Sequence, residues 1–276
     1  MKPEPKKLQL QYTGFLNTEQ LIFAPFEFPF LNFQLKNFSD TLPDDFVMPQ
    51  NIRLGQRMEV FMSAALKNEH YTIRAKNLQI IANKRTLGEL DFILEDHKEK
   101  KLIHLEMVYK FYFYRPEIEG DWRAKLIGPN AKDQLIFKLN KLSQHQFPIL
   151  KNRNTQLYLK DLRLLDRYIE QQIYFKAQIF VPFKFTTDQV ISKFQNCVAG
   201  IYFRREQLDF FLNSEYTYYI PPKNDWVSKP SEFEEFLPYR SFYKKISAAL
   251  EEQRSCMFWV KDCNTKVCKR HFATWW

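Results

Sequence analysis

The sequence predicts an α+β protein in which helices flank a mixed central sheet and an antiparallel, aromatic-rich accessory sheet occupies the C-terminal half. Three observations predict this class. The stretch Leu102–Phe113 alternates with the period of two that a strand imposes, and one of its faces is entirely apolar or aromatic. Apolar residues recur at helical spacing over 54–67, 131–146 and 238–253. Beyond residue 170, short aromatic stretches alternate with polar turns.

The composition indicates a folded chain with a basic balance. The chain has 276 residues, of which 45% are hydrophobic, enough to bury the core of one large domain or two modest ones. Its formal net charge of +9 favours a polyanionic partner such as nucleic acid, because phosphate contacts release counterions. A merely basic surface is the alternative, since net charge alone does not identify a partner.

The sequence also bears on compartment. It has no run of 18 or more uncharged apolar residues, so we expect no membrane partner. No apolar stretch follows the lysines near the N-terminus, which argues against a secretory signal. Four cysteines are too few for a disulfide framework and agree with a reducing compartment. We therefore expect a cytoplasmic protein.

Residues 1–50 predict an N-terminal segment that wraps the main domain. Five phenylalanines lie between residues 23 and 33, and the nearby prolines exclude a regular central strand or helix. We interpret the aromatic side chains as plugs for grooves on the main domain. A platform on which nucleic-acid bases stack is the alternative.

Residues 51–150 predict the core domain, which begins with a helix over 54–67. Glu59 falls at the border of the apolar stripe of this helix. The stretch 71–82 predicts the next strand. Gly88–Leu94 and Leu102–Phe113, joined by the charged stretch 95–101, then predict an antiparallel hairpin.

The hairpin presents charges on one side. Asp91 on its first strand and Glu106 on its second are expected on the same face, which His104 and Lys110 share. Burying such charges without partners costs on the order of several kcal/mol each, so they need ion-pair partners, a metal ion or a wet cleft. The alternative is structural: Lys110 and Glu106 neutralise each other one pleat apart.

The helix over 131–146 follows the break at Gly128–Pro129, with Asn130 as its expected cap. Its polar side carries Gln134 and Lys138, together with Lys141 and His145. We take Gln134 and Lys138 as candidates for the site or for a phosphate contact. For the other two side chains we prefer a solvated helix face.

Residues 151–276 predict an accessory β-rich region packed on the core. Its expected strands are 171–185, 198–203, 208–212, 216–220 and 255–260, with a helix over 238–253. The tail carries three cysteines and a histidine, a ligand set that structural zinc uses, at Cys256, Cys263, Cys268 and His271. Their spacing lacks a C-x2-C knuckle, so we favour buried or incidental thiols over zinc.

The order of elements and charges resembles the core of the PD-(D/E)XK nuclease-like superfamily, a restriction-endonuclease-like fold. Several strings are similar to those of an uncharacterised bacterial family, a domain of unknown function assigned to that superfamily. These strings are GQRMEVF (55–61), RTLGELDFIL (85–94), HLEMVYKFY (104–112), GPNAKDQL (128–135) with HQ (145–146), and PPKNDW (221–226).

The resemblance implies that Asp91 and Glu106 hold a divalent metal, Mg²⁺ or Mn²⁺, with Glu59 as a further ligand. It gives Lys110 the role of positioning the attacking water, with His104 in reserve, while Gln134 and Lys138 would grip a neighbouring phosphate. The superfamily usually spaces its last two groups as Glu-x-Lys, whereas Lys110 lies two residues further along the strand, about 6.6 Å at the usual strand rise.

The hypothesis from sequence is therefore a metal-dependent nuclease that hydrolyses phosphodiester bonds, with DNA preferred over RNA. Two alternatives remain: a nucleic-acid-binding protein that kept the fold without the chemistry, and a protein-interaction module. The sequence contains no G-x-x-x-x-G-K-[ST], G-x-G-x-x-G or G-x-S-x-G motif, which argues against nucleotide-loop and serine-hydrolase chemistry.

Overall fold

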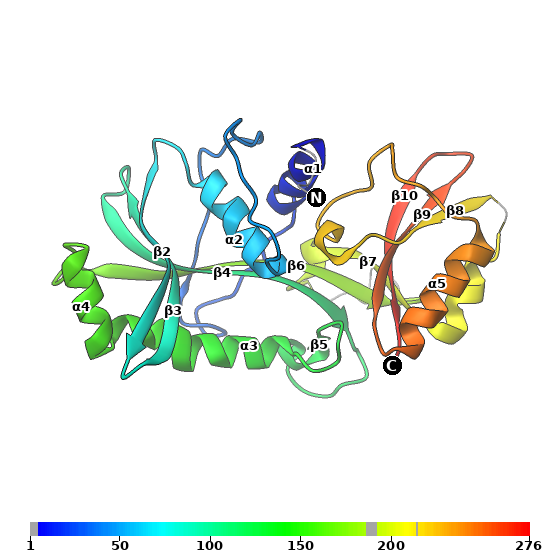
Figure 1. Cartoon of the computed structure of the whole chain (residues 1–276). Coiled ribbons are helices and arrows are strands. Elements are labelled where there is room, and N and C mark those ends of the chain that lie inside the picture. Colours follow the sequence, from blue (N-terminus) through cyan, green and yellow to red (C-terminus); the bar gives the residue numbers. More distant parts are fainter. Residues whose placement is uncertain (1–4, 186–191, 214) are drawn as a thin grey trace. The chain divides into compact units, whose positions relative to one another are not determined.

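The computed structural model describes residues 5–185, 192–213 and 215–276 (Figure 1). The fold is mixed α+β, and its paired strands are mostly antiparallel. The chain forms two compact units, each assembled from separate segments. The hairpin unit comprises Gln20–Tyr109 and Phe137–Lys176, and the C-terminal unit comprises Met1–Glu19, Lys110–Ile136 and Ala177–Trp276.

The hairpin unit is built on a sheet in the order β2-β3-β4-β6, with the short β1 paired in parallel to β6. The strands β4 and β6 continue into the C-terminal unit. The strands of this unit are β1 (Leu31–Asn32), β2 (Tyr71–Ala82), β3 (Arg85–Asp96), β4 (Lys101–Tyr114) and β6 (Ile169–Pro182). Its helices are α2 (Leu54–Ala65), α3 (Leu135–Lys141, in this unit from Phe137) and α4 (Arg153–Asp161).

A tight two-residue turn joins β2 to β3, and β4 pairs antiparallel to β3. Asn83 and Lys84 both have positive φ, as a two-residue hairpin turn of type I′ requires, and they join β2 to β3. Phe92 pairs with Leu105 in the antiparallel β3–β4 ladder. The predicted strands over 71–82, 88–94 and 102–113 and the helix over 54–67 are thus confirmed.

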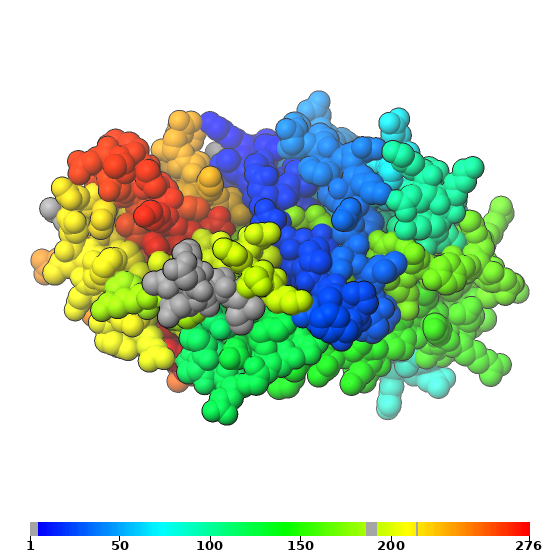
Figure 2. Space-filling model, turned by 180° about the vertical axis from the view of Figure 1, so that it is seen from behind, coloured from blue at the N-terminus to red at the C-terminus, as the bar shows by residue number. Residues whose placement is uncertain are grey.

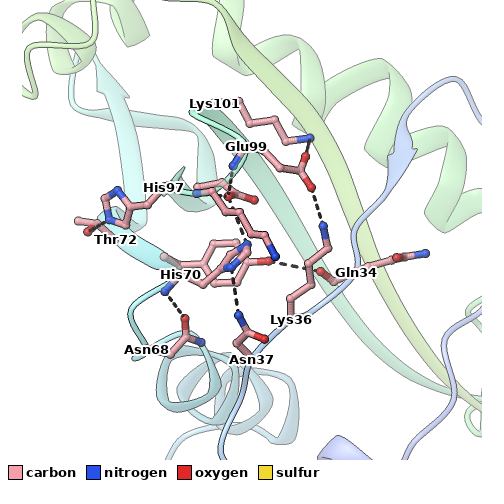
Figure 3. A network of polar contacts seen from close by, with 12 residues as sticks. Gln34, Lys36, Asn37, Asn68, His70, Thr72, His97, Glu99 and Lys101 are labelled. Carbon is pink, nitrogen blue, oxygen red and sulfur yellow. Dashed lines mark hydrogen bonds and ion pairs between the residues drawn. The ribbon is translucent and has the colours of Figure 1, made fainter.

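A polar network braces the turn between β3 and β4 (Figure 3). The buried ring of His70 lies 3.2 Å from Asp96 Oδ1 through its Nε2. The same carboxylate oxygen accepts hydrogen bonds from the main-chain amides of Lys98 and Glu99. Glu99 also pairs with Lys36 of the N-terminal segment at 2.5 Å. The network therefore stabilises the turn of the β3–β4 hairpin, whose strands carry Asp91 and Glu106.

Residues 20–36, blue in Figure 2, lie against the sheet of the hairpin unit, where β1 pairs with β6. Phe23 and Phe28 are almost fully buried, and the ring of Phe23 contacts Phe175 on β6 edge to face. Phe30 stacks on Phe147 with ring centroids 3.7 Å apart. The rings of this segment thus pack on β6 and on the turn that contains Phe147. Phe26, by contrast, is 85% exposed.

The apolar core of the hairpin unit lies between the sheet and the segment 147–161. Ile93 on β3 and Leu102 on β4 are buried with Ile149, Leu150 and Leu159. In Figure 1, α4 accordingly lies beside β2 and β3. Between α3 and α4 the chain forms a π-helical turn (η2, Leu142–Gln146) and a 3₁₀ turn (η3, Phe147–Lys151).

The C-terminal unit continues β4 and β6 and adds further strands and two helices. Its remaining strands are β5 (Leu126–Ile127), β7 (Val198–Arg204), β8 (Tyr216–Tyr219), β9 (Cys256–Asp262) and β10 (Cys268–Thr274). Its helices are α1 (Pro5–Leu16) and α5 (Tyr239–Glu251). The apolar face of α5 packs on β8, β9 and β10 through Phe242, Ile246 and Leu250.

Helix α1 is anchored by a buried carboxylate in the string PPKNDW. Asp225 is only 5% exposed, and its Oδ1 accepts a 2.6 Å hydrogen bond from Gln11. Lys7 lies 2.6 Å from the other oxygen. These contacts give Asp225 a structural role within the C-terminal unit.

Three local predictions were wrong. The helix predicted over 131–146 begins only at Leu135, because Ala131 has a φ of 57° that an α-helix cannot contain. The predicted strand 208–212 is a 3₁₀ helix (η6, Arg205–Phe211), capped by a hydrogen bond from the Arg204 amide to the Gln207 side chain. The accessory strands are not purely antiparallel, since β7 pairs in parallel with both β6 and β10.

Within the described residues, no helix reaches the length and apolar character that crossing a membrane requires.

Candidate functional site

Asp91 and Glu106 lie on the same side of the β3–β4 hairpin. Ile93 pairs with His104 in the antiparallel register, and continuing this register by two residues places Asp91 opposite Glu106. The main-chain amide of Met107 donates a 3.0 Å hydrogen bond to Asp91 Oδ2. The two acidic side chains that the sequence singled out are therefore neighbours across the ladder.

Glu106 is held from both of its carboxylate oxygens. His104 Nε2 lies 2.9 Å from Oε1, and the Gln146 side-chain amide donates to Oε2 at 2.8 Å. Glu106 is only 1% exposed, so these contacts replace water around the carboxylate. The Glu106 carboxylate is therefore fixed in orientation by the protein.

The hydrogen bonds around His104 define its tautomer. The Gln171 side-chain nitrogen donates to the main-chain carbonyl of Phe147 at 2.7 Å and lies 3.1 Å from His104 Nδ1. Because an amide nitrogen can only donate, Nδ1 accepts and the ring proton resides on Nε2, where it is donated to Glu106. Burial lowers the pKa of His104 to about 4, which keeps the ring neutral.

Burial also opposes ionisation of the two carboxyls. It raises the pKa of Asp91 well above the usual range, and the charge of Glu106 raises it further. It likewise raises the pKa of Glu106, while the positive charge of Lys138 acts in the opposite direction. Two neighbouring carboxyls that resist ionisation are typical of sites that bind a cation or transfer protons.

Glu59 of α2 contacts β2. Its Oε2 accepts a 2.7 Å hydrogen bond from the side chain of Asn77. Asn77 lies between the ladder pairs Lys76–Phe92 and Leu78–Leu90, which places it opposite Asp91. Asn77, Asp91 and Glu106 thus lie side by side on three neighbouring strands, with Glu59 at the Asn77 end. We call the carboxyl groups of Glu59, Asp91 and Glu106, together with Asn77, the acidic row. Burial raises the pKa of Glu59.

Lys110 and Gln134 belong to the C-terminal unit, whereas Asp91 and Glu106 belong to the hairpin unit. The ammonium of Lys110 lies 2.5 Å from Asp133 Oδ2, in a half-exposed ion pair. The backbone of Gln134 forms an isolated antiparallel β-bridge with Ile127 of β5. The predicted water-positioning lysine is therefore engaged by a carboxylate other than Glu106.

Lys138 of α3 lies in the hairpin unit with the acidic row. Its ammonium donates a 3.2 Å hydrogen bond to Gln146 Oε1, and Gln146 in turn donates to Glu106. Lys138 is therefore connected to the carboxylate through a single amide.

Comparison with known proteins places the chain in a family. The model of DUF1853, described as a domain of unknown function, matches residues 31–271. The chain belongs to the DUF1853 family. No curated protein and no solved structure matches it. The matched range of this DUF1853 member includes every residue of the acidic row and its hydrogen-bond partners.

Asp91 and Glu106 are the two carboxylates of this site in the DUF1853 chain that could hold a divalent cation. Mg²⁺ is commonly bound by one or two carboxylates with water completing its shell, and Asp91 and Glu106 supply two on one side of the sheet. A bound cation would favour the ionised form of both groups. Among the residues that the structure describes, no group of three or more His, Cys, Asp and Glu side chains is arranged to hold one ion, so Glu59 is not gathered as a third ligand.

The cysteines and histidine of the DUF1853 tail are not brought together. Cys256 on β9 pairs with Ala273, and Cys268 on β10 pairs with Lys261, which separates these two thiols along the ladder. All three tail cysteines are free thiols. His271 packs among the aromatic rings of Phe203, Phe211 and Phe258.

Three residues of the DUF1853 site escaped the sequence analysis. The sequence alone indicates no role for Gln146, Gln171 or Asn77. An asparagine inside an otherwise regular strand was the one available signal, because Asn tolerates positive φ better than most residues. The two glutamines gave no signal, since their importance depends on which groups the fold places beside them.

Proposed function

We propose that this DUF1853 protein is a metal-dependent nuclease that hydrolyses phosphodiester bonds of DNA or RNA. The observation that carries the proposal is the proximity of Asp91 and Glu106 on the neighbouring strands β3 and β4, where the Met107 amide next to Glu106 donates to Asp91 and burial raises the pKa of both carboxyls. A bound divalent cation would stabilise the ionised form of these buried carboxyls. Mg²⁺ and Mn²⁺ are cations that bind carboxylate oxygens.

The order of elements supports membership in the PD-(D/E)XK nuclease-like superfamily. Helix α2 precedes the meander β2, β3 and β4, and α3 follows it. Glu59, Asp91 and Glu106 lie on α2, β3 and β4 respectively, as in the pattern that the sequence resembles. A restriction-endonuclease-like core is part of the proposal.

In the proposed reaction, a water hydroxyl bonds to phosphorus while the bond to the leaving oxygen breaks and a proton passes to that oxygen. A bound Mg²⁺ or Mn²⁺ would polarise the phosphate and acidify the water. Asp91 and Glu106 would hold the ion. His104 and Gln146 fix the Glu106 carboxylate through hydrogen bonds to both oxygens, so little reorganisation is needed when substrate binds.

Nucleic-acid binding without hydrolysis is the second candidate function. The observation that favours it is the engagement of Lys110 by Asp133, together with the nearly complete burial of Glu106. A protein with an excess of positive charge and no lysine positioned for catalysis would bind phosphates without cleaving them. The net charge of +9 is compatible with both candidates.

The experiment compares the wild type with Asp91→Asn and Glu106→Gln on plasmid, linear and single-stranded DNA and on RNA, with Mg²⁺ or Mn²⁺. We expect cleavage by the wild type and a loss of about 100-fold or more in each variant, because each substitution removes a charged metal ligand. Glu95→Gln is the matched control, since Glu95 lies on β3 and pairs with Arg74 instead.

The outcomes separate the candidates. Products that are equal in the wild type and in both site variants reject hydrolysis at this site. Binding that weakens as salt rises, without metal-dependent cleavage, supports the second candidate. Absence of both cleavage and salt-dependent binding rejects both candidates.

A further inference from the structure

The ion pair of Lys110 accounts for its role within the C-terminal unit. Its partner Asp133 lies in the loop before α3, where the Asp133 carbonyl accepts a 2.7 Å hydrogen bond from the Gly128 amide. Lys110 therefore fastens the loop 128–133 to β4. This contact accounts for a lysine at position 110 without a catalytic role for it.

Lys138 is held toward the acidic row by an oriented amide. Gln146 donates through its nitrogen to Glu106, so its oxygen faces the other way and accepts from Lys138. Reversing the amide would set its nitrogen against an ammonium and its oxygen against a carboxylate, both of which are repulsive. The chain Lys138, Gln146, Glu106 is thus directional, with positive charge at one end and negative charge at the other.

The backbone between Lys138 and Gln146 is unusual. Residues Leu142–Gln146 form a π-helical turn directly after α3, and Gln146 is its last residue. π-helical turns are rare and frequently occur at functional sites, because they are less favourable than α-helix and must be maintained by other contacts. This turn sets the direction in which Gln146 leaves the helix.

The electrostatics agree with the geometry. The positive charge of Lys138 is close enough to act on Glu59, Asp91 and Glu106 at once. The hydrogen bonds through Gln146 keep this positive charge beside the Glu106 carboxylate, where it would also attract a phosphate bound at the site.

We propose that Lys138, and not Lys110, is the cation that contacts the scissile phosphate beside Asp91 and Glu106. The inference rests on the proposed function, because it assigns the phosphate contact within the same site. The lysine that the superfamily pattern places on the strand is supplied here by the helix that follows it. Lys110 is a structural residue of the C-terminal unit.

The test measures phosphate contacts separately from cleavage. Lys138→Met and Lys110→Met are compared with the wild type for binding of a fluorescent DNA oligonucleotide over a range of salt concentrations, with Ca²⁺ in place of Mg²⁺. Loss of one phosphate contact reduces the slope of log affinity against log salt by about 0.7 to 0.9. We expect this reduction for Lys138→Met, its recovery in Lys138→Arg, and a wild-type slope for Lys110→Met.

Cleavage with Mg²⁺ is then measured for the same proteins. We expect kcat to fall by about 100-fold in Lys138→Met, as for loss of one oriented donor to a developing charge, and to change by less than about 3-fold in Lys110→Met. Thermal unfolding checks that each variant is folded, and Lys138→Gln replaces Lys138→Met if the latter does not fold.

Each outcome decides a different point. A reduced slope in Lys110→Met with a wild-type slope in Lys138→Met overturns the assignment and leaves the nuclease proposal standing. Unchanged slopes in both variants also overturn it. A reduced slope in Lys138→Met without cleavage by the wild type supports a phosphate contact by Lys138 but rejects hydrolysis, and with it the assignment of Lys138 to a scissile phosphate. No salt-dependent binding by the wild type rejects the inference and the proposed function together.

Discussion

The side-chain amide of Asn77 donates a 2.7 Å hydrogen bond to Glu59, which links β2 to α2 at the end of the acidic row. Asn77 has a φ of 49°, in the left-handed region that few residues with a side chain adopt. A strand that contains such a residue is locally strained, and strain of this kind is found mainly where surrounding structure maintains it, often at functional sites.

Replacing Asn77 separates the backbone requirement from the hydrogen bond. Asn77→Ala loses the donor and places alanine at positive φ, so we expect a loss of about 2 to 3 kcal/mol in the free energy of unfolding. Asn77→Gly loses the donor but accepts the backbone conformation, so its loss should be smaller by about 1 kcal/mol. Urea unfolding measures both values, and equal losses in the two variants would contradict the role assigned to φ.

A second prediction concerns two helical glycines in different surroundings. A β-carbon on Gly14 of α1 would lie 2.2 Å from the Val227 carbonyl oxygen, a distance that the backbone must move to relieve. One on Gly55 of α2 would meet nothing within 4 Å. We expect Gly14→Ala to destabilise the protein by about 2 kcal/mol or more and Gly55→Ala to stabilise it by up to about 1 kcal/mol. Thermal unfolding of both variants tests the contrast, which would be refuted by equal shifts.

The hairpin and its acidic pair were accessible from the sequence because alternation reports directly on which residues share a face. Leu102–Phe113 has one fully apolar face, which places His104 and Glu106 together on the other face. The alternation did not indicate that this other face is buried as well, with Glu106 only 1% exposed. The same reasoning located α2 and α5 from their apolar stripes. Local patterns therefore sufficed to locate these elements and to show which residues share a face.

Features that depend on distant partners were not accessible. Nothing in the string around Lys110 indicates that Asp133 will pair with it, since a half-exposed ion pair leaves no periodic signal. The π-helical turn before Phe147 has no sequence signature, and the amide of Gln146 matters only because Glu106 and Lys138 flank it. The strand β10 was missed because its polar residues Lys269 and Arg270 interrupt the apolar alternation.

The protonation of His104 provides a third prediction. Its pKa, lowered by burial to about 4, keeps the ring neutral from about pH 5 upward, with the proton on Nε2. Nitrogen-15 NMR should show a protonated Nε2 and an unprotonated Nδ1 that do not titrate between pH 5 and pH 8, and His104→Gln assigns the signals. A ring protonated on Nδ1, or one that titrates near pH 6.5, would contradict the hydrogen-bond assignment.

The lowered pKa of His104 also predicts how the stability of the protein changes with pH. Because the folded pKa of His104 lies below its unfolded value of about 6.5, the unfolded chain binds the proton more tightly, so stability is lost as the pH falls from about 6.5 towards 4. His104→Gln should flatten this part of the profile. His271, whose pKa burial also lowers to about 4, adds a similar dependence that remains in the variant.

Asp91 provides the fourth prediction, with the opposite sign. Burial and the charge of Glu106 raise its folded pKa well above the unfolded value of about 3.9, so the folded state binds the proton more tightly. In metal-free protein this carboxyl therefore lowers stability as the pH rises above about 4. Asp91→Asn keeps an oxygen for the Met107 amide and removes the charge, so its Tm should exceed that of the wild type by several degrees at pH 8 and match it near pH 4.

Adding Mg²⁺ or Mn²⁺ should raise the Tm of the wild type above that of Asp91→Asn at pH 8. A cation that binds only the folded wild type stabilises it in proportion to the logarithm of the metal concentration, whereas Asp91→Asn lacks a ligand and should respond weakly. Glu95→Gln is the control on the same strand, because the hydrogen bond from Arg74 lowers the pKa of Glu95 and its loss should not raise the Tm at any pH. If metal-free Asp91→Asn is less stable than the wild type at pH 8, the carboxyl is not held against its ionisation, and the argument for a cation at this pair fails.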